Sequence, residues 1–293
     1  MKIMKLILLL SLFLSGSLYA LSNIQKKVPN VVPVSWLKDH LDDRRLVILD
    51  IREYNEYKKG HLKGAVNIPG LQNLFDAKSW MMPKLDFLKE LFSNAGIDND
   101  SLVVAYDNGD FFWAARLYWI LEVLGHHNVG ILKYAYGHYL EKNLPISTTN
   151  TIAKRKEFIP RVDNNQIQTK LSTLLAIGKK TIIDGRAKAH FEGQKSITKR
   201  YGHIPTAQNY ACTNNFAVTK DGARMKDFDE LAKVYKNIPK NKEIILYCQG
   251  GAEAALNYIV LTKLGYKASV YDGSWKEWGN DPAVPVENPA NKK

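Results

Sequence analysis

Short apolar runs alternate with longer apolar-rich segments along the chain. Four runs, dominated by β-branched and aliphatic side chains, have the length of strands buried on both faces of a sheet. They are Val47–Leu49, Leu102–Ala105, Thr181–Ile183 and Glu243–Leu246. Phe112–Leu124 and Ala252–Leu264 lack proline and are apolar enough to form packed helices. Strands that alternate with helices predict an α/β fold in which a mainly parallel sheet is flanked by helices.

This pattern occurs twice, in the same order, at offsets of about 140 residues. The matching segments are Leu46–Arg52 with Lys180–Arg186, Gly60–Asn67 with Gly202–Asn209, Ser101–Asp107 with Lys242–Cys248, and Leu124–His126 with Leu264–Tyr266. Two homologous domains are therefore predicted, at residues 24–147 and 163–279. A polar linker at 148–162 and a proline-rich, extended tail at 280–293 complete the predicted organisation.

The first twenty residues have the order of a secretory signal peptide. Lys2 and Lys5 precede the apolar run Leu6–Leu14, and the small residues Ser15–Ser17 follow it. The apolar run is about half of the ~20 residues that a membrane span needs. We expect residues 1–20 to be cleaved and the mature protein to be exported to a bacterial periplasm without a membrane span; an uncleaved signal anchor is the alternative.

The net charge of +12 is unevenly distributed. Residues 24–150 hold 15 basic and 15 acidic side chains, whereas residues 151–293 hold 24 basic and 14 acidic ones. The surplus of the mature chain thus lies in the second copy, where it could attract small anions. No nucleic-acid-reading motif accompanies it, so a nucleic-acid partner is not expected. Two cysteines are too few for a disulfide scaffold or a four-thiolate metal site.

Features that both copies share are more readily structural than catalytic, because only one copy needs the chemistry. Asp-x-Arg ends a predicted strand in each copy, at Asp50/Arg52 and at Asp184/Arg186, which favours a buried or half-buried ion pair. A Gly-His pair also occurs in each copy, so His61 and His203 are expected to be structural histidines.

The copies differ in the loop after the central strand, where Asp107 of the first copy is replaced by Cys248 in the second. A thiolate is a nucleophile, and the partial positive charge of a helix N-terminus stabilises it. Gly250 and Gly251 allow successive backbone N–H groups to converge on one anion. This loop is a candidate cradle for a thiolate, a persulfide or an oxyanion; a small buried cysteine at a strand end is the alternative.

The chain resembles, over residues 28–279, the tandem rhodanese family of thiosulfate and 3-mercaptopyruvate sulfurtransferases. Gly202–Ala207 and Asp272–Trp278 match its signatures, and Tyr106–Gly109, with Ala114–Arg116 downstream, matches its inactive first domain. The resemblance implies two tandem rhodanese-like domains, of which only the second is catalytic. It also implies a sulfurtransferase that moves a sulfane sulfur from a small anionic donor, with thiosulfate favoured, through a Cys248 persulfide. The acceptor would be a thiol or cyanide, and no metal or organic cofactor is required.

The resemblance also assigns the binding of the persulfide and the substrate to residues near Cys248. They are Gln249, Gly250, Gly251, Ala252, Glu253, Arg186 and His190. Three of these positions depart from the family. Gln249 with Gly250 matches neither the thiosulfate nor the mercaptopyruvate pattern, and His190 stands where the family has its substrate arginine. Glu253 replaces a threonine or serine; an acid suits the first turn of a helix but repels a dianion.

A basic segment at residues 188–200 occurs only in the second copy. Its basic residues are Lys188, His190, Lys195, Lys199 and Arg200. It either flanks the active site and attracts the donor or is a solvated loop. The second cysteine, Cys212, is expected to be a small half-buried thiol; the alternative is a disulfide with Cys248 that would switch the enzyme off.

Related folds also carry cysteine-dependent phosphatases and arsenate reductases. These enzymes need an arginine about six residues after the cysteine to bind the oxyanion, and this chain has Ala254 there. The sequence therefore argues against them. A persulfide carrier or sensor that passes its sulfur to a protein partner stays open, as do 3-mercaptopyruvate and polysulfide as donors.

Overall fold

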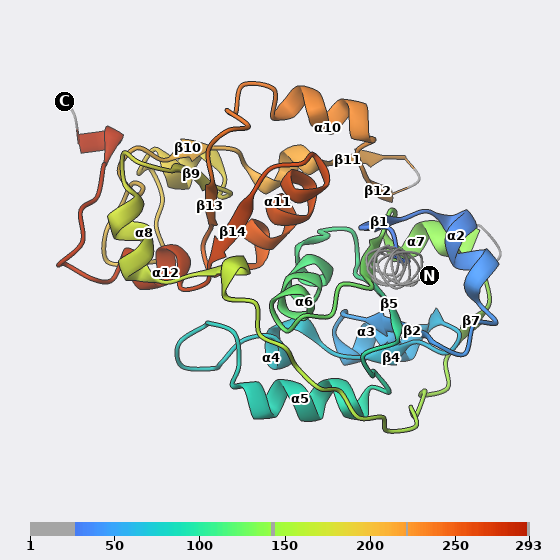
Figure 1. The fold of residues 1–293 in the computed structure, drawn as a ribbon. Coiled ribbons are helices and arrows are strands. Elements are labelled where there is room, and N and C mark those ends of the chain that lie inside the picture. The colour runs from blue at the N-terminus through green and yellow to red at the C-terminus, as the bar shows by residue number, and fades with distance from the viewer. Residues whose placement is uncertain (1–26, 142–143, 221, 292–293) are drawn as a thin grey trace, which may run out of the picture.

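The computed structural model describes residues 27–141, 144–220 and 222–291, and it contains two parallel sheets that lie side by side (Figure 1). The predicted leader at residues 1–20 lies outside the described residues. Within the described ranges, no helix combines the length and the apolar character needed to cross a membrane.

The first sheet has five parallel strands in the order β1-β6-β5-β2-β4. These are β1 (Val31–Val32), β6 (Val129–Leu132), β5 (Leu102–Tyr106), β2 (Leu46–Asp50) and β4 (Val66–Asn67). The helices of this domain are α2 (Val34–His40), α3 (Tyr54–Lys59), α4 (Gly70–Asn73), α5 (Leu85–Asn94), α6 (Phe112–Val123) and α7 (Tyr136–Glu141). A short antiparallel pair joins β3 (His61–Leu62), which follows α3, to β7 (Ile146–Ser147), which follows α7.

The second sheet repeats this topology in the order β8-β14-β13-β9-β10. Its strands are β8 (Ile167–Gln168), β14 (Ala268–Tyr271), β13 (Ile244–Tyr247), β9 (Thr181–Asp184) and β10 (Gln208–Asn209). The helices are α8 (Lys170–Ala176), α9 (Lys188–Phe191), α10 (Phe228–Val234), α11 (Ala252–Lys263) and α12 (Ser274–Trp278), with 3-10 turns at η1 (Asn164–Gln166), η2 (Cys212–Asn215) and η3 (Pro289–Asn291). Each strand of the second sheet has a counterpart at the same place in the first sheet, which confirms the prediction of two α/β domains of one type.

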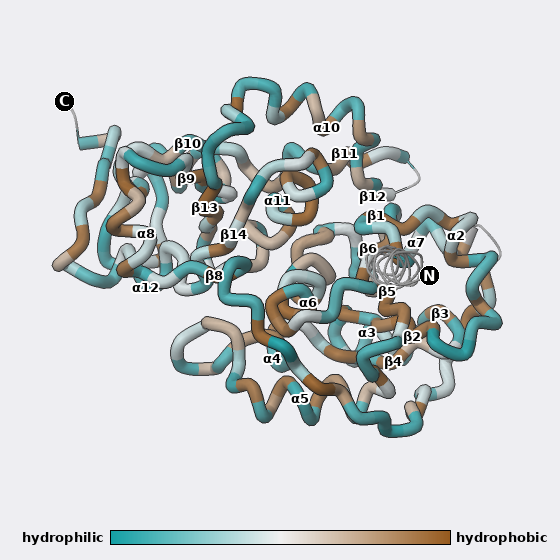
Figure 2. The backbone as a smooth tube through the Cα atoms, viewed as in Figure 1, coloured by the Kyte–Doolittle hydropathy of each residue, from teal (hydrophilic) through white to brown (hydrophobic). Residues whose placement is uncertain are grey.

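Helices α6 and α11 pack against each other between the two sheets (Figure 1). Each is covered by its own sheet on one side and by the other helix on another, so nearly every residue of both is buried. In Figure 2 hydrophobic colour covers much of α6 and α11 and of the strands beside them. Apolar side chains of both domains belong to one continuous core, in which the rings of Tyr118 and Tyr258 lie 6.5 Å apart. This shared core fixes the two domains against each other.

Two segments outside the sheets add to the interface. The hairpin of β11 (Phe216–Thr219) and β12 (Gly222–Met225) extends from the second domain to the first, where Ala135 donates a backbone hydrogen bond to Ala223. The stretch at 148–163 contains no helix or strand and is held to the first domain by the buried ring of Phe158, which packs on Phe92.

The tail is less extended than predicted. Residues 282–284 form a turn and a bend, in which the Asp281 carboxylate accepts the backbone N–H of Ala283. Glu287 then pairs with His203 in an isolated bridge, and the 3-10 turn η3 follows. Hydrogen bonds from the N–H groups of Ala290 and Asn291 to the side chain and the carbonyl of Asn288 stabilise that turn. The prediction considered only the prolines and not these local hydrogen bonds of Asp and Asn side chains.

Candidate active site

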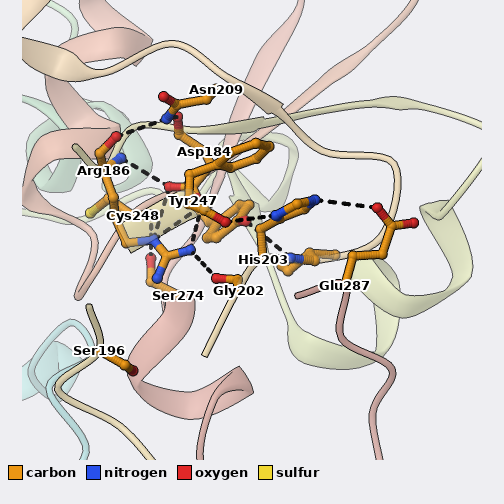
Figure 3. Close-up of polar contacts among 12 residues, drawn as sticks. Asp184, Arg186, Ser196, Gly202, His203, Asn209, Tyr247, Cys248, Ser274 and Glu287 are labelled. Atoms are coloured by element: carbon orange, nitrogen blue, oxygen red, sulfur yellow. Dashed lines mark hydrogen bonds and ion pairs between the residues drawn. The ribbon is translucent and has the colours of Figure 1, made fainter. Parts of the chain in front are cut away.

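The same buried polar frame supports the carboxyl ends of the strands in both domains. Asp184 and Arg186 form a buried ion pair of 2.5 Å, and Asp50 and Arg52 form its counterpart at 2.6 Å. In the second domain, Arg186 also donates to the carbonyl of Gly202 (Figure 3). The ion pair expected from Asp-x-Arg is therefore present twice, which confirms a structural role for the motif.

His203 belongs to this frame. A ring nitrogen of His203 is 2.8 Å from the carbonyl oxygen of Phe191, and its ring stacks on the Phe191 ring at 3.8 Å. His61 makes the equivalent contacts with Tyr57, at 2.9 Å and 3.7 Å. Figure 3 shows His203 between the strand ends and Glu287 of the tail. Both histidines are thus buried and hydrogen-bonded, as predicted for structural residues.

Cys248 lies directly after β13 in a cradle of backbone N–H groups. The N–H of Gly251 donates to Sγ of Cys248 at 3.0 Å, and Gly251 adopts φ +95°, which favours glycine. The backbone N–H of Cys248 itself donates to the Ser274 hydroxyl, which donates in turn to the carbonyl of Tyr271. The loop therefore fixes the sulfur at the N-terminus of α11, where the sequence placed it.

The pKa of the Cys248 thiol is raised to about 12, chiefly by burial and secondly by the charge of Glu253, although the N–H groups of Ala254, Gly250 and Gly251 oppose the shift. Burial therefore favours the thiol, whereas the N–H groups of the loop favour the thiolate, which is the nucleophilic form.

The corresponding loop of the first domain already contains its own anion. The carboxylate of Asp107 accepts the backbone N–H groups of Gly109, Phe111 and Ala114 at 2.9, 3.0 and 3.2 Å. Phe111, in the position of Gly251, has φ 59°. The N–H groups of this loop that could bind a foreign anion are thus occupied by Asp107, in contrast to the loop of Cys248.

A cavity of about 350 Å³ opens at Cys248 between the two domains. From the second domain it is lined by Arg186, Ala187, His190, Ile197, Cys248, Gln249, Gly250, Ala252 and Glu253. Of the predicted site residues, all but Gly251 are in this lining, and Gly251 contacts the sulfur through its N–H. The structure therefore brings the predicted set together around one thiol.

The wall contributed by the first domain is aromatic and was not identified from the sequence. It consists of Phe75, Trp80, Phe112 and Trp113. Phe112 and Trp113 belong to the apolar run that the sequence assigned to packing, so the only available signal was the clustering of three aromatic residues beside Asp107. The first domain thus forms part of the cavity beside Cys248.

Three side-chain nitrogens in the lining are buried and have no hydrogen-bond partner among the described residues: Arg186 Nη1, His190 Nδ1 and Gln249 Nε2. Unpaired buried polar groups are costly, and they are satisfied when a ligand brings acceptors. The cavity is accordingly suited to a ligand with several oxygen atoms.

Glu253 adds a negative charge beside this group. It is half-buried and lines the cavity together with Cys248. Burial and the charge of Asp184 raise the pKa of Glu253, and the polar groups of Gln249 and Cys248 and the charge of Arg186 oppose this shift.

The basic segment at 188–200 reaches the cavity mainly through His190. Arg200 instead donates to the carbonyls of Trp278 and Val284, at 2.6 and 2.7 Å, and so holds the tail. Lys188 is exposed and lies 3.4 Å from the carboxylate of Glu192. Lys195 and Lys199 are absent from the described lining. Of the basic residues of this segment, His190 is thus the one found in the described lining of the cavity.

Cys212 lies at the start of η2 and is buried, and both cysteines are free thiols. Burial raises the pKa of Cys212, and so does the charge of Glu253. The disulfide with Cys248 is therefore not formed in this structure. Among the described residues, no cluster of three or more histidine, cysteine or acidic side chains suits a metal ion.

Two contacts tie the first domain to the loop of Cys248. Arg116 of α6 forms a buried 2.6 Å ion pair with Asp272, whose second oxygen accepts the backbone N–H of Met82. Trp80 lies over Gly250, and Nζ of Lys276 is 3.4 Å from the centroid of the Trp80 ring. The relative position of the domains therefore determines the shape of the cavity.

Comparison with known proteins places these observations in a family. The model of the rhodanese-like domain matches residues 33–142 and 168–281. A thiosulfate sulfurtransferase from Corynebacterium glutamicum is 30% identical over 279 residues, covering 90% of this chain and 92% of that protein. The sulfur carrier protein TtuD from Thermus thermophilus is 28% identical, covering 87% and 95%. The crystal structure of SseA from Escherichia coli, described as a 3-mercaptopyruvate sulfotransferase, superposes with a TM-score of 0.75 at 27% identity, covering 85% of this chain and 99% of that one.

Proposed function

The chain belongs to the rhodanese-like domain family, in two tandem copies, and is a sulfurtransferase; we propose that it moves the sulfane sulfur of thiosulfate through a persulfide on Cys248. The acceptor in this proposal is a thiol or cyanide. The observation that carries it is the difference between the two loops. The first loop binds its own carboxylate with three N–H groups, whereas the second presents a sulfur atom to an N–H group inside a cavity.

The first half-reaction is a displacement at sulfur. The Cys248 thiolate attacks the outer sulfur of thiosulfate, a new S–S bond forms, and the S–S bond of the donor breaks. The electron pair of that bond leaves with sulfite. Cys248 is thereby oxidised to a persulfide while the sulfonate sulfur is reduced, and the total charge of −3 is conserved. The N–H groups around Cys248 favour the anionic persulfide because they lie at a helix N-terminus.

In the second half-reaction the acceptor attacks the terminal sulfur of the persulfide. With cyanide the products are thiocyanate and the Cys248 thiolate, so the charge of −2 is conserved. No electron carrier enters either step.

The choice of thiosulfate rests on the three unpartnered nitrogens of Arg186, His190 and Gln249. A sulfonate has three oxygens that could accept hydrogen bonds from them. 3-Mercaptopyruvate also has three oxygens, but only the two of its carboxylate share the negative charge, and a polysulfide has none. Arg186 keeps its ion pair with Asp184 through other nitrogens, so Nη1 could bind the donor without breaking it.

Mass spectrometry of the intact protein tests the proposal. The purified chain is incubated with thiosulfate, 3-mercaptopyruvate or polysulfide, and then with cyanide or a thiol. We expect a gain of one sulfur atom on Cys248, fastest with thiosulfate and accompanied by sulfite, and its loss with the acceptor. Cys248→Ser should abolish the gain, and the matched variant Cys212→Ser should retain it. Absence of the gain with every donor would overturn the proposal.

A second candidate is a persulfide carrier that delivers sulfur to a protein partner, because one relative bears the name of a sulfur carrier protein. A carrier would acquire sulfur from a donor at a normal rate but would turn over poorly with cyanide or small thiols. The same experiment separates the two functions by the rate of the second half-reaction.

We also propose that residues 1–20 direct the protein to the periplasm, on the basis of their charged, apolar and small-residue order. Fractionation of cells that produce the full chain, with N-terminal sequencing of the product, tests this. A full-length product in the cytoplasmic fraction would contradict it.

A further inference from the structure

The cavity at Cys248 has two walls of opposite character. The wall of the second domain carries the unpartnered nitrogens of Arg186, His190 and Gln249, which suit the oxygens of a donor. The wall of the first domain consists of four aromatic side chains. Ile197 of the second domain adds an apolar side chain to the lining and is 67% exposed. Thiosulfate is a small polar dianion, so the first half-reaction makes no use of these apolar surfaces.

The volume of the cavity also exceeds what the donor needs. A water molecule takes about 30 Å³ of liquid, so an ion of five heavy atoms fills only part of the available 350 Å³. Cavities of this size, with mostly apolar walls and a few polar groups, are typical of sites for small organic molecules. The second substrate, which is the acceptor, is the one that could use the remaining space.

We propose that the acceptor is an organic thiol with an aromatic or similarly bulky apolar body, which packs between the aromatic wall and Ile197. This acceptor class deepens the proposed function and rests on it. The body is uncharged, because Glu253 lines the same cavity and the persulfide is itself an anion, so that a further negative charge would be repelled.

The aromatic wall lies beside the reacting sulfur. Trp80 packs against Gly250, two residues after Cys248, where an added Cβ would be 3.2 Å from its ring. Phe112 and Trp113 start α6, and their ring centroids are 5.2 Å apart. These three aromatic side chains are half-buried, which leaves part of each ring open to a ligand. A thiol whose body packs on this wall would therefore lie next to the persulfide.

Trp80 is fixed in place before any ligand binds. Its backbone has φ 61°, a left-handed conformation that a bulky side chain rarely adopts. The carbonyl of Asp76 accepts the N–H of Trp80 at 2.8 Å, and the Asp76 carboxylate accepts that of Ser79, also at 2.8 Å. Nζ of Lys276 lies over the Trp80 ring. Strained positions persist only where their surroundings hold them, and they are concentrated at ligand sites, so Trp80 offers a preformed surface.

The transfer step needs no further reactant. The acceptor thiolate attacks the terminal sulfur of the persulfide, a new S–S bond forms, and the S–S bond to Cys248 breaks. The electron pair of that bond stays on Sγ of Cys248. The acceptor is oxidised to a persulfide anion while Cys248 is reduced to its thiolate, and the total charge of −2 is conserved.

Removal of sulfur by two matched thiols tests the acceptor class. The chain is loaded with thiosulfate, freed of excess donor, and mixed with 2-phenylethanethiol or with 2-mercaptoethanol, which are both primary alkyl thiols. Loss of sulfur from Cys248 is followed by intact mass as a function of thiol concentration. We expect the aromatic thiol to react at least ~10-fold faster at low concentration, mainly through a lower half-saturating concentration.

Three variants connect this preference to the cavity. Trp80→Ala and Ile197→Ala should each reduce the ratio of the two rates at least ~3-fold. Ile197 is largely exposed, so its truncation should not affect folding. The matched control Phe87→Ala removes a 47% exposed aromatic ring of α5 outside the described lining and should keep the wild-type ratio.

Equal rates with both thiols in the wild type, or an unchanged ratio in both cavity variants, would overturn the acceptor class while leaving the proposed function intact. Slow removal by both thiols would overturn it in favour of a protein acceptor. Absence of sulfur gain with every donor would overturn the proposed function and the acceptor class together.

Discussion

Two adjacent glycines in the loop of Cys248 differ sharply in what an added methyl group would contact. A Cβ on Gly251 would lie 2.6 Å from Nη1 of Arg116, whereas a Cβ on Gly250 would lie 3.2 Å from the ring of Trp80. Gly251 also has φ +95°, while Gly250 has an ordinary backbone conformation. We therefore expect Gly251→Ala to be much more destabilising than Gly250→Ala.

The magnitude follows from two contributions. A left-handed backbone costs an alanine about 1–2 kcal/mol. Non-bonded heavy atoms are optimally separated by about 3.5–4.0 Å, so Arg116 would have to move by roughly 1 Å. Such a move weakens its 2.6 Å buried ion pair with Asp272, and complete loss of such a pair costs about 3–5 kcal/mol. With partial loss, Gly251→Ala should lower the free energy of unfolding by about 3–5 kcal/mol.

Phe111 in the first domain indicates that the contact with Arg116 contributes more to the cost than the left-handed backbone does. It occupies the equivalent position at φ 59°, so the fold tolerates a side chain in a left-handed conformation where no guanidinium blocks it. Gly250→Ala, which requires only a small shift of Trp80, should cost less than about 1 kcal/mol.

Urea unfolding followed by tryptophan fluorescence measures both variants against the wild type. Sulfur gain on Cys248, measured by mass, reports whether the loop still holds the sulfur. We expect Gly251→Ala to lose most of this gain and Gly250→Ala to retain it. If the two variants unfold within about 1 kcal/mol of each other, contact with Arg116 is not what requires glycine at residue 251, and the reasoning is refuted.

Two further predictions concern buried charges. Arg116→Met should lower the free energy of unfolding by about 3–5 kcal/mol, because the buried Asp272 carboxylate then keeps only the N–H of Met82 as a partner. Adding Asp272→Asn should recover part of that loss. Additive effects of the two substitutions in urea unfolding would contradict this coupling. Burial lowers the pKa of His126 to about 4, whereas an unfolded histidine titrates near 6.5. The unfolded state therefore binds the proton first, and stability present above pH 6.5 should be lost as the pH falls toward 4, by about 3 kcal/mol. His126→Gln should remove this part of the pH dependence in urea unfolding at pH 7 and pH 4.5, and parallel losses in both proteins would contradict the assignment.

Much of the architecture could be predicted from local pattern. The run Thr181–Ile183 lies in the interior strand β9, and the helix predicted at Ala252–Leu264 is α11 within one residue. Comparison of the copies was equally informative. The ion pair of Asp184 and Arg186 has a counterpart in the first domain, whereas Cys248 has no cysteine as its counterpart. These features depend on residues close in sequence, or on a repeat that the sequence itself displays.

The aromatic wall of the cavity depends on contacts that sequence spacing does not show. Trp80 reaches Gly250 from the other domain, and their separation along the chain gives no indication of this. The charge of Arg200 left open whether it flanks the donor or lies in a solvated loop, and its guanidinium instead binds the carbonyls of Trp278 at the end of α12 and of Val284 in the tail. Charge alone did not distinguish a cation that meets a ligand from one that satisfies the backbone.

The carboxylate of Asp107 fills the loop of the first domain as a permanently attached anion would. Its three N–H contacts span a loop one residue longer than the loop of Cys248, and Phe111 rather than glycine precedes the helix. Replacement of Asp107 by cysteine alone would therefore leave a loop too long, and shaped for a carboxylate. The two domains are thus not interchangeable by a single substitution, because the first is built to fill its own loop and to supply the aromatic wall beside Cys248.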